Sequence, residues 1–548
     1  MAVIMFYKKT YFLTLATIIT LVGGILFYSY FSRIPVMPIA STSTKQPDPI
    51  SHERQQSETA IAVPITNPVH VVTKRPVKKI SPSKRISGRI QKKSSSVLLI
   101  TKPEKKIQPK PTIIAPTVIQ KDPLYWNWKL IDTNQIYFPS DFLWGVATSA
   151  MQVEGNCTNT DWAVWEKNKN IIPCGNACDS WNRYKEDIQL LKQLGVKSYR
   201  FSIEWSKVEP QQDVFDEAVL KHYEEICKEL VKNGIKPIIT LHHYTNPLWF
   251  YALGGFEKEY NTKHFITYCA KVFVRLHQYV HLWLTFNSPT SYVARAYYAH
   301  LTPPGIQNMQ LMQEVLKNIL DAHVQTYQSL KKLPGGSLCR IGICHNIYQV
   351  EPKNFWDKVS CATAYSCFNE NVYQFFKTGH FKVSVPFKAT VRHYNAGAPQ
   401  SLDFIGLNYY SHGNMSGFDV KPYPGDIPTQ NEIYTIYPEG LYRALQEINK
   451  ELAAPLHIPI YITENGIATA NDDHRKLFFE RYLYALSYAI NTGIPVKGYT
   501  VWSLIDNYEW GSYDINYGIY AMDFKTLERS KKPRAGAHYF IDVVKKFS

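Results

Sequence analysis

Cysteine is scarce in this sequence, and its few cysteines do not form paired motifs. The chain has 9 cysteines in 548 residues, and none follow the C-x-x-C spacing that structural zinc sites use. Cys157, Cys174 and Cys178 gather in one stretch, where an oxidising compartment would allow one disulfide. We therefore predict neither a metal centre nor another cofactor.

A glycine-rich phosphate loop is also missing. The first apolar, β-like run, FLWGVATSA, leads into MQVEGN without repeated glycines. An open, doubly wound sheet that binds a dinucleotide would carry such a loop after its first strand. That fold is therefore our second choice.

Acidic residues are few in the N-terminal part of the chain, so the net charge of +16 is unevenly spread. Residues 1–122 hold 19 Lys and Arg against 5 Asp and Glu, whereas residues 123–548 hold 42 against 40. The basic excess belongs to a tail. Nucleic-acid binding by the nearly neutral remainder is not expected.

Residues 11–31 contain no charged side chain. This stretch is long enough to cross a bilayer as a helix and exceeds the apolar core of a cleaved signal peptide. We predict a short N-terminal segment 1–10 followed by a single-pass membrane anchor at 11–31. Lys8 and Lys9 precede the span and favour a barrel on the non-cytoplasmic side, although the basic residues further on argue weakly for the opposite orientation.

Residues 32–122 are rich in Pro, Ser and Lys and predict a disordered linker, because such a composition buries too little apolar surface to offset chain entropy. Segment 71–110 carries 13 basic residues and one acidic residue. It fits either a solvated spacer or a binding segment for anionic lipid or another polyanion.

From about residue 136, short β-like runs alternate with helical patterns. Eight runs are found, from FLWGVATSA to GYTVWSLID, and stretches such as DEAVLKHYEEICKELVKNGI show the apolar spacing of amphipathic helices between them. Gly195 and Gly234 stand where two helices should end. Eight alternating units predict an α/β fold, a (β/α)₈ barrel over residues 123–548.

Polar residues follow nearly every one of these runs. In a barrel, the carboxyl ends of the strands converge on one face, where active sites lie. The polar strand ends are Gln152 and Glu154, Glu204, His242 and His243, Asn287, Asn408 with Tyr409, Glu464 with Asn465, and Glu509 with Trp510.

The run YITENG places Glu464 at one of these ends. A carboxylate there is suited to attack the anomeric carbon of a sugar, as in retaining glycosidases. Around it, Trp502, Trp510 and Tyr409 offer flat apolar faces, and Gln152, His243, Asn287 and Glu509 offer groups for sugar hydroxyls. We therefore expect a β-glycoside or another small carbohydrate as ligand.

Several motifs together resemble glycoside hydrolase family 1, the β-glucosidase family. They are FPSDFLWGVATSAMQVEGN, YRFSIEWSKVEP, TLHHYTNPLW, DFIGLNYY, YITENG, VWSLIDNYEW and MDFKTLERSKKP. The resemblance implies a (β/α)₈ barrel, Glu464 as the nucleophile and Tyr409 as its hydrogen-bond partner. It further implies that Gln152, His243, Asn287 and Glu509 hold the sugar hydroxyls, with Trp502 stacked beneath the ring and Trp510 assisting through its indole N–H.

One position departs from the family pattern. Family members typically read T-F/L-N-E-P after the fourth strand, with Glu as the acid/base, but this chain reads Thr285-Phe286-Asn287-Ser288-Pro289. A serine hydroxyl is a poor proton donor and base, and general acid–base assistance contributes about 10²–10⁴-fold in rate. No Asp or Glu lies between Thr285 and Gln310 to replace it.

Three interpretations follow from Ser288. The first is a retaining glycosidase restricted to activated aglycones, since the thioglucosidases of this family carry Gln at the same position. The second is a sugar- or protein-binding pseudoenzyme, similar to the membrane-anchored klotho proteins. The third is a structural scaffold, against which the retained Glu464 and its hydroxyl-binding residues argue.

Overall fold

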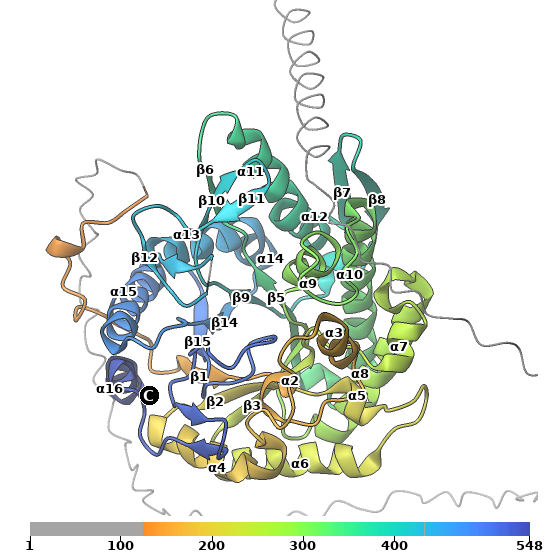
Figure 1. Ribbon diagram of the computed structural model, residues 1–548, viewed down its shortest axis with the longest axis horizontal. Coiled ribbons are helices and arrows are strands. Elements are labelled where there is room, and N and C mark those ends of the chain that lie inside the picture. The colour runs from red at the N-terminus through yellow and green to blue at the C-terminus, as the bar shows by residue number, and fades with distance from the viewer. Residues whose placement is uncertain (1–123, 432) are drawn as a thin grey trace, which may run out of the picture. The chain divides into compact units, whose positions relative to one another are not determined.

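The computed structural model describes residues 124–431 and 433–548. In this part of the chain, eight parallel strands close into a barrel in the order β1-β15-β14-β9-β5-β4-β3-β2 (Figure 1). They are β1 (Leu143–Ala147), β2 (Ser198–Ser202), β3 (Lys236–His242), β4 (Leu282–Phe286), β5 (Arg340–Asn346), β9 (Phe404–Asn408), β14 (Ile460–Asn465) and β15 (Val496–Trp502). Seven of them lie within the predicted runs, and β15 begins two residues before its predicted run, so the barrel prediction is confirmed.

Helices surround the strands (Figure 1). Two end where the sequence predicts: Gly195, at φ 76°, caps α4, and Gly234, at φ 73°, follows α6, a left-handed conformation that glycine adopts without a Cβ clash. The principal helices are α2 (Ala150–Val153), α3 (Asp161–Lys169), α4 (Ser180–Leu194), α6 (Glu217–Lys232), α8 (Thr262–Leu276), α9 (Pro289–Tyr297), α10 (Met309–Lys332), α11 (Asp357–Tyr365), α12 (Asn371–Thr378), α13 (Pro438–Ile448), α15 (Asp472–Asn491) and α16 (His538–Phe547).

The core lies between the strands and this helical layer. In α6, the buried residues Leu220, Tyr223, Cys227 and Leu230 recur every three or four positions, which is the spacing of one helix face. Trp144 of β1 and Trp283 of β4 are fully buried within the same core. Strands covered in this way show continuous apolar runs, which explains why the sequence reveals them.

Short strands extend the rim beyond the carboxyl ends of β5 and β9. One three-stranded sheet joins β6 (Val350–Pro352), β10 (Gly413–Ser416) and β11 (Asp419–Lys421). The strand pair β12 (Ile427–Pro428) and β13 (Thr435–Ile436) also follows β9, and the hairpin β7 (His380–Val385) with β8 (Ala389–Tyr394) precedes it. The β6–β10–β11 sheet and the β12–β13 pair, which follow strand ends, build the surroundings of the barrel mouth.

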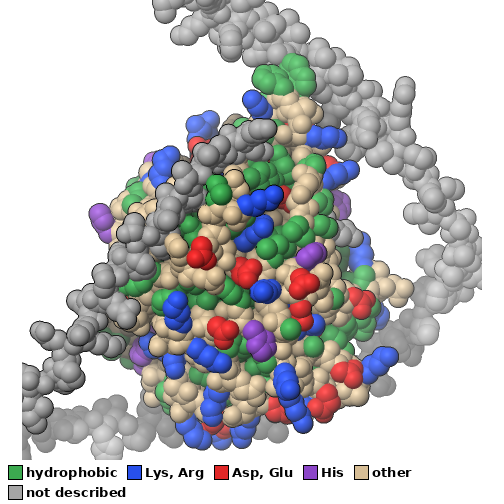
Figure 2. Space-filling view, turned by 90° about the vertical axis from the view of Figure 1, so that its left-hand side faces the viewer, with side chains coloured by type: hydrophobic (Ala, Val, Ile, Leu, Met, Phe, Trp, Pro, Cys, Tyr) green, Lys and Arg blue, Asp and Glu red, His purple; other side chains and the backbone are tan. Residues whose placement is uncertain are grey.

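The predicted segment 1–10, anchor 11–31 and linker 32–122 lie outside the described residues. Within the described ranges, no helix has the length and hydropathy needed to span a membrane. Figure 2 shows Lys and Arg interspersed with Asp and Glu on the side that carries α15 and α16, as expected for a nearly neutral barrel.

The disulfide that the clustered cysteines would allow is not formed. All nine cysteines lie in the described ranges and are unpaired there. The Cys174 thiol donates to the Met151 carbonyl at 3.0 Å, and the Cys178 thiol donates to the Asp506 carbonyl at 3.2 Å. These cysteines act as buried packing residues with weak thiol donors.

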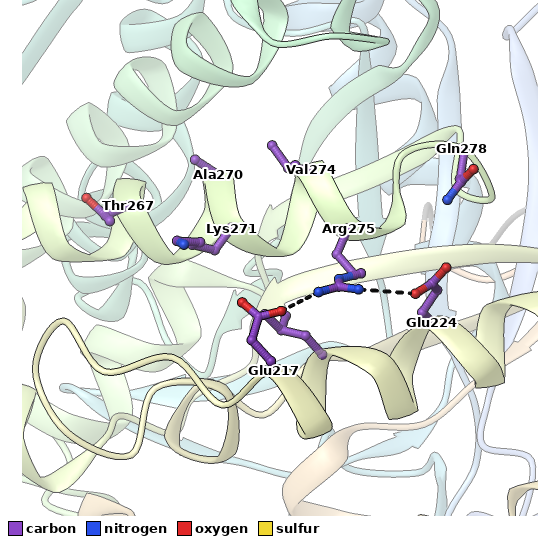
Figure 3. A pocket seen from close by; sticks show the side chains of 9 residues that line it. Glu217, Glu224, Thr267, Ala270, Lys271, Val274, Arg275 and Gln278 are labelled. Atoms are coloured by element: carbon purple, nitrogen blue, oxygen red, sulfur yellow. Dashed lines mark hydrogen bonds and ion pairs between the residues drawn. The ribbon is translucent and has the colours of Figure 1, made fainter.

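A groove of about 610 Å³ runs between α6 and α8 on the outside of the barrel (Figure 3). Arg275 pairs there with both Glu217 and Glu224 across the two helices. None of its lining residues belongs to a barrel strand or to a segment that follows a strand end. The groove is therefore separate from the predicted site.

Candidate active site

Glu464 lies on β14, and both of its carboxylate oxygens are hydrogen-bonded. Oε1 accepts a hydrogen bond from Nη1 of Arg200 at 2.7 Å, and Oε2 accepts one from the Tyr410 hydroxyl at 2.7 Å. The Glu464 residue is only 5% exposed. Two charge-assisted hydrogen bonds, one from within β2 and one from the segment after β9, hold this carboxylate in one orientation.

The prediction that Tyr409 is the hydrogen-bond partner of Glu464 is wrong by one residue, because Tyr410 makes this hydrogen bond. The Tyr409 hydroxyl instead donates to the backbone carbonyl of Tyr437 at 3.2 Å, and its side chain is fully buried. Tyr409 and Tyr410 follow β9, where successive side chains point in opposite directions. Tyr410 therefore faces the barrel mouth, while Tyr409 faces the helical layer.

Arg200 lies inside β2 and was not predicted as a site residue. Besides Glu464, its guanidinium donates to Asn287 Oδ1 at 2.7 Å, to the Thr463 carbonyl at 3.0 Å and to Thr240 Oγ1 at 3.0 Å. It is 1% exposed. The only sequence signal is an arginine within the buried run SYRFS, where an unpaired charge would be costly.

Asn287 and Ser288 follow β4 and join the same hydrogen-bond network through Asn408. The Asn408 amide donates to Asn287 Oδ1 at 2.9 Å and to Ser288 Oγ at 2.8 Å, and Asn408 Oδ1 accepts from the Thr463 hydroxyl at 2.7 Å. Ser288 is buried in a left-handed conformation, φ 42°, at the start of α9. Asn408 therefore joins the side chains of Asn287 and Ser288 in one hydrogen-bond network.

His243 follows β3 and contacts the Asn287 amide. Asn287 Nδ2 lies 3.3 Å from His243 Nε2, and because Asn287 Oδ1 already accepts two hydrogen bonds, its amide nitrogen is the donor. Burial and the nearby Arg200 and His242 lower the pKa of His243 well below its usual value. The imidazole is therefore neutral, with Nε2 as acceptor and its proton on Nδ1.

Trp502 and Trp510 complete the aromatic side of the cluster. The His243 ring stacks near both, with ring centroids 5.8 Å from Trp502 and 6.3 Å from Trp510. Trp502 ends β15, and Trp510 lies in the loop that follows it. The structure therefore brings these two indoles together, as the sequence predicts.

Gln152 and Glu509 hydrogen-bond to each other next to Trp502. Gln152 Nε2, from α2, donates to Glu509 Oε2 at 2.9 Å, and the Trp502 side chain also hydrogen-bonds to this carboxylate. Burial raises the pKa of Glu509 to about 7, and the charge of Glu464 adds to the shift, while Arg295, Gln152 and Trp502 oppose it. Glu509 thus changes its protonation state near neutral pH.

Other polar strand ends serve the scaffold. Glu154 pairs with Lys207 at 2.8 Å, and Glu204 accepts hydrogen bonds from Ser206 and Thr245. Asn465 donates to the Tyr409 carbonyl at 2.7 Å. The prediction that strand ends gather at one face holds, but these residues join the loops to the barrel.

Among residues 124–431 and 433–548, no carboxylate hydrogen-bonds to Ser288. Its neighbours are the Asn408 amide and the side chain of Tyr244, and burial raises the pKa of Tyr244 well above its usual value. Arg295 lies seven residues further along α9 and lowers the pKa of both Tyr244 and Glu509. Tyr244 and Arg295 are two site neighbours that the sequence did not reveal.

A small cavity of about 10 Å³ lies beside Tyr410, the hydrogen-bond partner of Glu464. It is lined by aromatic residues that include Tyr434 and Tyr517, together with Gly466 next to the Glu464 strand end. The Tyr410 and Tyr434 rings stack at 5.3 Å with 7° between their planes. The β12–β13 segment thus supplies one wall next to the carboxylate.

A closed parallel barrel with a carboxylate, amides, an imidazole and indoles at one end of its strands has the architecture of a barrel glycosidase. Residues 134–547 match the model of glycosyl hydrolase family 1, and the chain belongs to this family.

Individual relatives agree with this assignment. The chain is 30% identical to "Beta-glucosidase A" of Thermotoga maritima over 447 residues, 74% of this chain and 98% of that protein. Among solved structures, the beta-glycosidase from Pyrococcus horikoshii is 34% identical with a TM-score of 0.68, covering 75% of this chain and 96% of that one. The beta-glucosidase from Thermotoga maritima in complex with deoxynojirimycin is 27% identical with a TM-score of 0.67, covering 75% and 99%.

Proposed function

We propose that this protein is a retaining β-glycosidase restricted to glycosides with good leaving groups, with Glu464 as the nucleophile. The observation that carries the proposal is the doubly hydrogen-bonded Glu464 carboxylate, which shares one hydrogen-bond network with Asn287 and His243 through Arg200. The His243 ring stacks near Trp502, and Trp502 and Gln152 both hydrogen-bond to Glu509. The names of the relatives support a β-glycoside as substrate.

In the first step, a Glu464 oxygen forms a bond to the anomeric carbon as the bond to the aglycone oxygen breaks. The aglycone leaves with the electron pair, as an anion, because Ser288 supplies no carboxylic acid proton. The result is a covalent glycosyl-enzyme. Asn287, Gln152 and Glu509 hold the sugar hydroxyls, and Trp502 stacks beneath the ring.

In the second step, water or another small nucleophile attacks the same carbon and releases Glu464. Water needs a base, which a typical family member supplies from the position of Ser288. An anion such as azide needs none. Turnover in water should therefore be slow after a fast first step.

The test is the reaction with 2,4-dinitrophenyl β-glucoside, with and without azide. We expect a burst of one dinitrophenolate per protein, slow turnover, and acceleration by azide with formation of the β-glucosyl azide. Peptide mass spectrometry with a 2-fluoro analogue should place the sugar on Glu464. The absence of both burst and label at Glu464 would refute the proposal.

The second candidate function is a sugar- or protein-binding pseudoenzyme, and Ser288 favours it because catalysis loses its proton donor there while the hydroxyl-binding residues remain. This alternative predicts that deoxynojirimycin raises the melting temperature although no glycosyl-enzyme forms. The membrane-anchored location of the barrel, on the non-cytoplasmic side, remains a separate proposal.

A further inference from the structure

An exposed aromatic surface lies at the start of α11. Phe355, Trp356 and Val359 are 69%, 67% and 70% exposed, and Phe418 in the neighbouring β10–β11 turn is 42% exposed. We call these four residues the aromatic rim. Large apolar side chains that cluster on a solvent-exposed face in this way indicate an interaction surface.

The aromatic rim is held in place by hydrogen bonds to the side chains of Asn354 and Asp357. The Asn354 side chain accepts from the Trp356 backbone N–H at 2.9 Å, and the buried Asp357 carboxylate accepts from the Asn354 N–H at 3.2 Å. Asp357 also accepts from the Gly417 N–H at 2.7 Å, which fixes the turn that carries Phe418. The rings therefore stay outside because the backbone places them there.

Lysines flank the aromatic rim. Lys353 and Lys358 are exposed, and the Lys358 ammonium lies 5.2 Å from the Phe355 ring centroid. The acids of this segment are neutralised or buried: Asp357 is buried, and Asp419 lies 3.5 Å from Lys421. The available charge on the rim is therefore positive.

The described chain begins next to this surface. The Tyr437 hydroxyl donates to the Leu124 carbonyl at 2.9 Å, and Arg443 Nη1 binds both the Tyr437 hydroxyl, at 2.9 Å, and Glu351, at 2.8 Å. Glu351 belongs to β6, which leads directly to Lys353. Figure 1 shows β6, β10, β11 and α11 at one edge of the barrel.

From these observations we infer that the aromatic rim docks on an anionic lipid bilayer. Aromatic rings with lysines beside them suit the membrane–water interface, where the rings enter the headgroup region and the ammonium groups meet anionic lipids. The uncharged stretch 11–31 and the basic segment 71–110 precede Leu124, the first described residue, in the sequence. A tether of this kind would raise the local concentration of bilayer at the rim, so weak docking suffices.

A second copy of this chain fits the rim less well. A two-fold contact brings the same patch together from both subunits, so that the lysines of the two copies would face each other. An anionic bilayer has no such repulsion. The inference does not depend on catalysis, because the aromatic rim is separate from Glu464.

The test uses photo-crosslinking in the full chain, with Trp356→benzoylphenylalanine and, as control, Leu338→benzoylphenylalanine. Leu338 is 78% exposed and lies just before β5 begins, at the opposite end of the barrel. Each variant is mixed with excess vesicles of phosphatidylcholine alone or of three parts phosphatidylcholine to one part phosphatidylserine. We expect lipid labelling at 356 to exceed that at 338 by at least about tenfold on the anionic vesicles.

A charge-reversal variant tests the role of the lysines. Lys353→Glu with Lys358→Glu should lower labelling at 356 several-fold on phosphatidylserine vesicles and little on phosphatidylcholine alone. Equal labelling at 356 and 338 would overturn the inference whether or not the chain inserts its N-terminal segment. Crosslinking of 356 to a second copy of the chain, in place of lipid, would overturn it too.

Discussion

The Asn408 side-chain amide donates a 2.8 Å hydrogen bond to the Ser288 hydroxyl, while the same nitrogen donates to Asn287. Ser288 therefore belongs to the network that orients the Asn287 side chain. A carboxylate at 288 would meet the same amide as a donor.

Ser288→Glu should accordingly raise the hydrolysis of unactivated β-glucosides by at least about 10²-fold, because it restores an acid and base where the aglycone leaves. The measurement is kcat/KM on an alkyl β-glucoside, with Ser288→Ala as the matched control. An unchanged rate in the Glu variant would show that this side chain does not limit turnover.

Tyr410→Phe should slow the labelling of Glu464 by a 2-fluoro dinitrophenyl glucoside by about tenfold to a hundredfold, since a hydrogen bond to a charged group is worth about 1.5–3 kcal/mol. The hydroxyl of the neighbouring Tyr409 donates to a backbone carbonyl, so Tyr409→Phe should lower stability by about 1 kcal/mol without this slowing. Intact-mass kinetics distinguish the two. Equal rates in both variants would contradict the assignment of Tyr410.

Arg200→Met should destabilise the barrel by about 3–5 kcal/mol, because it leaves the buried Glu464 carboxylate without its cation. The control is Arg275→Met, whose pairs with Glu217 and Glu224 are exposed or half-buried and contribute at most about 1 kcal/mol. Urea unfolding at neutral pH gives both values. Similar losses in the two variants would argue against a buried ion pair at Glu464.

The raised pKa of Glu509 predicts that the free energy of unfolding depends on pH. The folded protein holds the proton up to about pH 7, whereas the unfolded chain releases it near 4.5. Unfolding therefore releases a proton in this window, so the free energy of unfolding falls as pH rises from about 4.5 to about 7, by roughly 3 kcal/mol in total. The difference between wild type and Glu509→Gln isolates this change, because other titrating groups are common to both. A difference independent of pH would disprove it.

The sequence predicts the barrel well because its strands are buried on both faces and appear as apolar runs bounded by polar ends. The β6–β10–β11 sheet was not predicted, since strands of three or four residues carry too little periodicity to detect.

The site was predicted where one residue type at a strand end suffices, as for Glu464, Asn287 and His243. It failed at Tyr409 because a shift of one residue along an extended segment exchanges inward and outward side chains, and two adjacent tyrosines give no cue to the register. Arg200 was missed because its partners come from β4 and β14, which are distant in the sequence.

Because the Arg200 guanidinium is buried, a substitution at position 464 and a substitution at position 288 would differ in how much they destabilise the barrel. Glu464 is its counter-ion, so a neutral residue there would strand a positive charge inside the barrel. Ser288 carries no charge, and its hydroxyl hydrogen-bonds to two neutral side chains, Asn408 and Tyr244. A neutral residue at position 464 would therefore leave an uncompensated cation in the barrel interior, whereas an exchange of side chain at position 288 creates no such imbalance.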